Sequence, residues 1–257
     1  MSRGAFPRVD DHLVIPEVTR DEIIRGRRVV ALPALPPRAR KKIDLDYVVR
    51  AFVAPGYRTA ADLLTRFGET SDFASDACIY KDGIDPSTGA RYLEEIAFEI
   101  VAEQSERKVT EKAEAMQRRG VRRIFAIFVK GPRLCEWSPE SGRWQPLDAD
   151  SRIEDRCLVA PLAVASLLDP ALADAAVLDA LIAKGNPVIL KWKADAEARG
   201  KAEGVAESIL RVLEAREVAV SAAQREEILG CSDRDRLDRW LRRAALASSA
   251  DEVTAEP

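Results

Sequence analysis

The sequence predicts a mixed α/β domain over residues 1–169, followed by an α-helical region over residues 170–257. Two observations lead to this fold class. Strand-like and helix-like segments alternate in the first part, and the composition shifts to Ala, Glu, Lys and Arg after residue 169. With 257 residues, 47% hydrophobic and 32% charged, the chain can bury a substantial core and still supply charges for surface helices.

The first expected elements surround a proline-rich segment. Thr19 and Glu22 have the spacing of a capping box, which predicts a short helix beginning there. Residues 28–32 are expected to form a strand and residues 33–37, with three prolines, an extended link. Apolar residues at helical spacing then predict a helix over residues 38–54.

Two strands with a hairpin loop between them follow, at residues 73–80 and 94–101. Asp85-Pro86 and Gly89 are the turn signals of that loop. Alternation in the second strand assigns its side chains to two faces, one with Glu95, Ala97, Glu99 and Val101 and the other with Ile96, Phe98 and Ile100.

The rest of the first domain reads as helix, strand and hairpin. A charged helix is expected over residues 105–119, with Gly120 as its left-handed cap. Residues 121–130 have the apolar character of a buried strand, and residues 135–147 contain a Ser-Gly turn between two short strands.

Helices dominate the predicted C-terminal region. Ala-rich segments extend to about Gly185, a long charged helix begins near Pro187, and two short helices are expected over residues 222–250. The long helix carries an apolar stripe formed by Ile209, Leu210, Val212 and Leu213. That stripe either packs on the chain's own core or forms a homodimer seam.

The composition excludes several classes of protein. His12, the only histidine, lies in a polar leader, so His-dependent hydrolases and His-ligated zinc enzymes are excluded. The four cysteines lack zinc-site spacing, and Cys78 and Cys157 lie in apolar runs typical of a core. No segment has the apolar length of a membrane span or the features of a signal peptide, so no membrane partner and a cytoplasmic location are expected.

Positive charge is concentrated in two stretches. Residues 25–42 hold seven Lys or Arg and no acid, and residues 106–133 hold nine against three Glu. Such stretches can form a surface that binds nucleic-acid phosphates. They can equally be the solvated faces of ordinary helices.

Two carboxylates lie inside consecutive predicted strands. A carboxylate buried in a strand without a partner costs several kcal/mol, so Asp76 and Glu99 suggest a partner such as a cation, a lysine or a water network. Carboxylates on neighbouring strands suit Mg²⁺, which needs only one or two of them and keeps several waters. The alternative is that Glu99 faces solvent beside Glu95.

Four segments together carry a resemblance to a known family. The succession SDFASDACIY, EEIAFEIV, RRGVRRIFAIFV and a Trp-containing hairpin is similar to the Uma-two family of endonucleases. That family belongs to the PD-(D/E)XK, or restriction-endonuclease-like, superfamily. The resemblance implies a restriction-endonuclease-like mixed sheet flanked by helices, with a helical C-terminal extension. It also implies Mg²⁺-dependent hydrolysis of phosphodiesters in DNA, with Mn²⁺ as a substitute.

The resemblance assigns a role to four residues. Glu22 in EIIRG matches the entry glutamate, Asp76 the aspartate of the PD motif, and Glu99 the strand carboxylate. Lys112, eight residues before Gly120, matches the helix lysine. Asp76 and Glu99 would hold the metal, Lys112 would orient water or stabilise the phosphate, and Glu22 would assist.

Several family marks are altered. Val101 stands where the superfamily has its strand lysine, Ser75 replaces the proline before the aspartate, and Met116 replaces a tyrosine. A histidine common after the proline-rich link is also missing, and basic residues stand there. A catalytically inactive nuclease fold that serves as a binding or assembly module is therefore the alternative.

Overall fold

The computed structural model describes residues 6–14, 21–30, 35–102 and 105–255. They divide into two compact units, Met1–Lys184 and Gly185–Pro257. The division falls after the expected boundary at residue 169, because helix α4 (Ala173–Ala183) buries one face in the core of the first unit.

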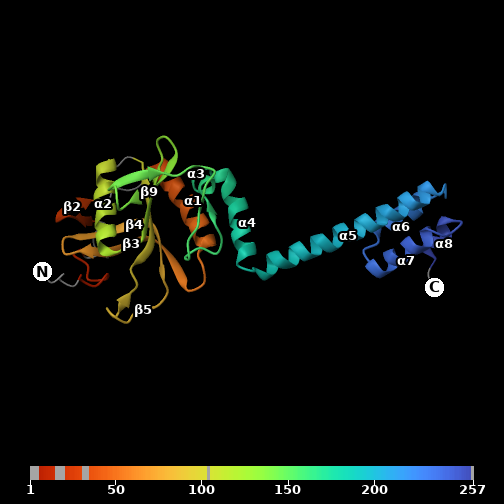
Figure 1. Ribbon diagram of the computed structural model, residues 1–257, viewed down its shortest axis with the longest axis horizontal. Coiled ribbons are helices and arrows are strands. Elements are labelled where there is room, and N and C mark those ends of the chain that lie inside the picture. Colours follow the sequence, from red (N-terminus) through yellow and green to blue (C-terminus); the bar gives the residue numbers. More distant parts are fainter. Residues whose placement is uncertain (1–5, 15–20, 31–34, 103–104, 256–257) are drawn as a thin grey trace. The chain divides into compact units, whose positions relative to one another are not determined.

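An eight-stranded mixed sheet forms the centre of the first unit (Figure 1). Its order is β10-β9-β8-β7-β4-β1-β2, with β3 paired to β4. β7 and β8 are parallel and all other neighbours are antiparallel. The strands are β1 (Asp21–Ile24), β2 (Arg27–Val30), β3 (Tyr57–Gly68), β4 (Ser71–Lys81), β7 (Glu94–Val101), β8 (Arg123–Phe128), β9 (Arg133–Ser138) and β10 (Arg143–Pro146). Two small ribbons pair β5 (Ile84–Asp85) with β6 (Ala90–Arg91) and β11 (Arg152–Ile153) with β12 (Leu162–Ala163).

Helices cover both faces of this sheet. Figure 1 shows α1 (Pro36–Phe52) and α2 (Glu106–Arg119) on opposite sides of the strands. The short helix α3 (Val164–Leu168) and helix α4 pack against α1. A 3₁₀ turn at Pro170–Leu172 precedes α4. The prediction of a mixed sheet flanked by helices is confirmed.

The two faces of β7 show how the layers are built. Ile96, Phe98 and Ile100 lie in the core shared with α1, while Ala97 packs with Ala113 and Met116 of α2. This is the alternation predicted from the sequence. Glu99 therefore lies on the α2 side of the sheet and is buried there, so the alternative that it faces solvent is wrong.

Local signals placed several element ends correctly. Gly120 has φ 115°, the left-handed conformation expected of the cap that ends α2. Cys78 and Cys157 are buried, and all four cysteines are free. The long helix α5 begins at Pro187 as predicted.

The N-terminal part differs from the prediction. Residues 21–24 form strand β1 and not a helix, because Ile23 pairs with Asp72 of β4. The Glu22 side chain accepts a hydrogen bond from the Ala74 backbone N–H and does not cap a helix. Thr19 lies outside the described residues. Pro36 is the first residue of α1 and not part of an extended link, since proline is tolerated in the first turn of a helix.

Strand β3 has no counterpart among the predicted elements. Its sequence, YRTAADLLTRFG, lacks strict alternation, and Asp62 has φ 51° in the middle of the strand. Pairing with β4 along almost its whole length supplies the order that the local pattern does not.

The second unit is a helical bundle with its own core. It contains α5 (Pro187–Ala215), α6 (Ala222–Gly230), α7 (Arg234–Ala244) and α8 (Ala250–Thr254). The stripe residues Ile209, Leu210 and Leu213 are buried against Leu237 and Trp240 of α7. The stripe is thus covered within its own chain, and a homodimer through these helices stays a prediction.

Candidate functional site

The sheet register brings two predicted carboxylates to the same place. Ala77 pairs with Phe98 and Cys78 with Ala97, so the next antiparallel position sets Asp76 opposite Glu99. Residues directly opposite each other in a sheet project from the same face. α2 crosses this face and contributes Lys112, and β1 contributes Glu22.

Glu99 is the most deeply enclosed member of the group. Only 1% of its surface is exposed, and neither carboxylate oxygen has a hydrogen-bond partner in the described part of the chain. An ion pair joins it to Lys112, with Nζ 3.6 Å from Oε2. Burial raises the pKa of Glu99 to about 8; Lys112 opposes this effect, while Asp76 and Glu22 add to it.

Lys112 is held in the middle of the site by two hydrogen bonds. Its Nζ donates to Glu22 Oε1 and to the Ala74 carbonyl, each at 2.9 Å. Burial alone would lower the pKa of Lys112, but the carboxylates of Glu99 and Glu22 outweigh it and raise that pKa to about 12. The site therefore contains a fixed, buried positive charge.

Glu22 links three elements. Its Oε1 also accepts from the Ala74 backbone N–H at 3.2 Å, and its Oε2 lies 3.8 Å from Nζ of Lys108. Burial lowers the pKa of Lys108. Because Glu22 fixes Lys112 relative to β4, it acts as a positioning residue in this arrangement.

Asp76 is fully engaged. Its Oδ1 accepts from Arg38 Nη2 at 2.5 Å and its Oδ2 from the Ile100 backbone N–H at 2.6 Å. Lys42 donates to the Asp76 carbonyl and lies 3.2 Å from Asp62 Oδ1. The start of α1 thus delivers two cations to the Asp76 end of the site.

The structure gathers all four residues that the sequence singled out, Glu22, Asp76, Glu99 and Lys112. Sequence reasoning did not assign a role to Arg38. The only signal was the basic run at the start of the α1 sequence, which indicated positive charge and no particular partner. His12 is not among the residues that contact these four side chains; its Nδ1 lies 3.0 Å from Oδ1 of Asp72.

The donor set limits what metal this site can hold. In the described residues, no three His, Cys, Asp or Glu side chains form a ready-made metal-binding group. Two carboxylates are nevertheless enough for Mg²⁺, which completes its shell with water. The unbonded oxygens of Glu99 fit such an ion, whereas Asp76 would have to share its oxygens with Arg38 or release it.

The two basic stretches meet each other across the sheet edge. Arg25, which precedes β2, pairs with Glu114 of α2. Arg27, the first residue of β2, pairs with Glu111 of the same helix. Part of the positive charge of both stretches is therefore neutralised within the protein. Arg27 and Arg28 of the first stretch lie close to Arg107 and Lys108 of the second, where β2 meets the start of α2.

Comparison with known proteins gives distant structural likenesses only. No family model and no curated protein matches the chain. Among solved structures, a protein from Anabaena variabilis named "a putative nuclease belonging to DUF820" matches with a TM-score of 0.48 and 14% identity, covering 58% of this chain and 89% of that one. Function therefore has to be inferred from the side chains around Glu99 and not from that likeness.

No helix in the ranges that the structure describes is both long enough and apolar enough to cross a bilayer.

Proposed function

We propose that this chain is a metal-dependent nuclease that hydrolyses phosphodiester bonds in DNA, with Mg²⁺ as cofactor and Mn²⁺ as a substitute. The observation that carries the proposal is the carboxylate of Glu99, which is buried without a hydrogen bond beside Lys112 and opposite Asp76. A buried carboxylate left in this state is unfavourable unless a cation meets it or it takes up a proton. The resemblance to the Uma-two family supports the same assignment.

Asp76 and Glu99 would hold the metal. A divalent ion bound by them would lower the pKa of a coordinated water and neutralise charge on the scissile phosphate. Lys112 keeps its positive charge at neutral pH and lies 3.6 Å from Glu99, so it can stabilise the extra negative charge of the phosphate in the transition state. Glu22 holds Lys112 in position through the 2.9 Å hydrogen bond.

Plasmid nicking tests this proposal. The wild-type protein is expected to convert supercoiled DNA in Mg²⁺ or Mn²⁺ and to leave it intact in EDTA. Asp76→Asn and Glu99→Gln should each reduce the rate at least about 100-fold, since loss of a metal ligand removes several kcal/mol of charge stabilisation. Loss of activity without loss of fold, checked by circular dichroism, is the expected result.

Glu95→Gln is the matched control. Glu95 lies on the same strand, but its carboxylate pairs with Arg122 and Arg156 outside the site. This variant should nick DNA at the wild-type rate. If the wild type shows no metal-dependent nicking, or if Asp76→Asn and Glu99→Gln nick as well as Glu95→Gln, the proposed function is wrong.

The alternative from the sequence, an inactive nuclease fold that serves as a binding or assembly module, is favoured by one contact. Arg38 already neutralises Asp76, so the protein is able to balance that carboxylate without a metal. Calorimetric titration with Mn²⁺ separates the two functions. Metal binding that depends on Glu99 but gives no cleavage would favour the module.

A further inference from the structure

A pocket of about 390 Å³ opens at the edge of the first unit where β2 meets the start of α2. Among the described residues, Arg27, Arg28, Arg107 and Lys108 line it together with a single carboxylate, Glu111. Its volume lies at the lower end of the range for small-molecule sites, roughly 300–1,000 Å³.

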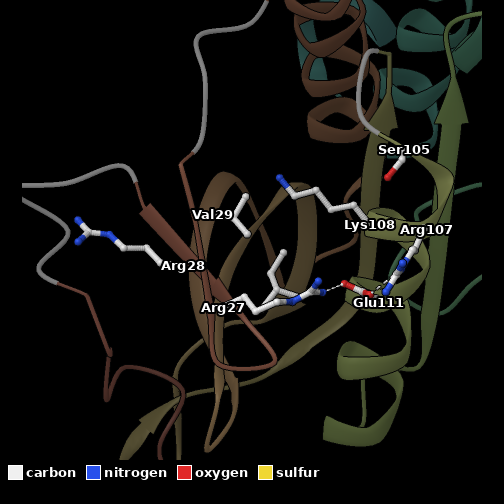
Figure 2. A pocket seen from close by; sticks show the side chains of 8 residues that line it. Arg27, Arg28, Val29, Ser105, Arg107, Lys108 and Glu111 are labelled. Atoms are coloured by element: carbon white, nitrogen blue, oxygen red, sulfur yellow. Dashed lines mark hydrogen bonds and ion pairs between the residues drawn. The ribbon is translucent and has the colours of Figure 1, made fainter.

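Arg28 pairs with Asp21 outside the lining, but the charges of Arg27, Arg107 and Glu111 do not cancel. Arg27 and Arg107 both pair with Glu111, and Figure 2 shows their guanidinium groups meeting at that carboxylate. The two arginine side chains are 58% and 82% exposed, so most of their N–H donors remain open to a ligand. One carboxylate shared between two arginines leaves an excess of positive charge.

The pocket is also directly connected to the candidate site. Lys108 lines the pocket, and its Nζ lies 3.8 Å from Oε2 of Glu22. Glu22 in turn holds Lys112 beside Glu99. A group bound beside Lys108 would thus be linked to Glu99 through Glu22 and Lys112.

The walls of the pocket are of two kinds. Ile24 and Val29 contribute aliphatic surface beside the cations. A phosphate with its attached sugar has the matching chemistry, because the phosphate oxygens accept from arginine and lysine while the sugar carbons contact aliphatic side chains.

We propose that this pocket binds a backbone phosphate and sugar of a nucleic-acid strand, next to the phosphate that reaches Asp76 and Glu99. The inference rests on the proposed function for its choice of ligand. The pocket would set where along the strand the protein binds, by fixing one phosphate relative to the carboxylates. It would do so without reading the base sequence.

Binding in EDTA tests the pocket without requiring cleavage. The probe is a short fluorescein-labelled single-stranded oligonucleotide, followed by fluorescence anisotropy over a series of salt concentrations. The double variant Arg27→Gln, Arg107→Gln should bind at least about tenfold more weakly at low salt. Its slope of log affinity against log salt should fall by about 1 for each phosphate that the variant no longer binds.

The matched control removes two other exposed arginines, Arg143→Gln and Arg152→Gln. Arg143 lies on β10, at the opposite edge of the sheet from β2. This control should keep the wild-type affinity and slope. Equal affinities for the two double variants would overturn the pocket proposal, even for a protein that nicks DNA.

A second variant separates a loss of binding from a loss of fold, because it is expected to bind the oligonucleotide more tightly. Glu111→Gln removes the only carboxylate among the described lining residues, so it should tighten oligonucleotide binding about two- to fivefold by removing one charge that repels phosphate. Glu114→Gln, one turn away on the same helix and outside the lining, should not. Unchanged or weaker binding by Glu111→Gln would contradict the proposal. If binding depends on Arg27 and Arg107 but no cleavage is ever seen, the proposed nuclease function is wrong and the pocket proposal still holds.

Discussion

Replacement of Glu99 by Gln should make the metal-free protein more stable, and by an amount that grows with pH. The carboxyl is buried without a hydrogen bond, and its pKa is raised from the ordinary 4.5 to about 8. Between these two values the unfolded chain has released the proton that the folded chain keeps. The free energy of unfolding of the wild type therefore falls as pH rises through this window.

The size of the effect follows from the pKa. Each pKa unit corresponds to about 1.4 kcal/mol, so deprotonating Glu99 in the folded protein costs about 5 kcal/mol in all. About 3 kcal/mol of this develops between pH 5 and pH 8. Gln has the same shape and does not titrate, so the stability of Glu99→Gln relative to wild type should rise by about 3 kcal/mol over that range.

Urea unfolding in EDTA, followed by tryptophan fluorescence at several pH values, measures this difference. Titrating groups that do not interact with Glu99 are common to both proteins and cancel. Glu95→Gln is the control: burial alone would raise the pKa of Glu95, but Arg156 and Arg122 outweigh it and lower that pKa, so no growing difference is expected above pH 5. Adding Mg²⁺ at pH 8 should stabilise the wild type and not Glu99→Gln. A difference between Glu99→Gln and wild type that stays constant from pH 5 to pH 8 would refute the reasoning.

Four further predictions concern the support of the site, the division of the chain and its self-association. Lys112→Met should destabilise the protein by about 3–5 kcal/mol in urea unfolding, because buried Glu22 loses the cation that it binds; an unchanged midpoint would contradict the buried ion pair. Gly120→Ala should lower the stability by at least about 1 kcal/mol in thermal unfolding, since φ 115° strains any residue with a Cβ, whereas a gain in stability would show that the cap is not left-handed. A chain ending at Lys184 should stay folded, whereas one ending at Asp169 loses the buried face of α4 and more than about 3 kcal/mol, and equal melting temperatures would contradict the observed division. Light scattering should show fewer chains per particle for the protein ending at Lys184 than for the full chain, and equal numbers would exclude association through the C-terminal helices.

The sequence by itself determined the elements whose signals are local. Strand β7 with its two faces, helix α2 and the cap at Gly120 could all be placed from a period of two, a period of 3.6 and one glycine. These patterns depend on neighbours within a few residues, so they survive without knowledge of the fold. They were enough to set Glu99 on the face of the sheet opposite to Ile96 and Phe98.

The long-range contacts decided the rest. Glu22 belongs to a strand and not to a helix because its side chain bonds with Lys112, 90 residues away, and Ile23 pairs with β4. The burial of Glu99 required α2 to lie over β7, and the pairing of Asp76 with Arg38 required the start of α1 to approach β4. Both are consequences of packing between distant segments, which no local pattern records, and they decide how a cation would be held at this site.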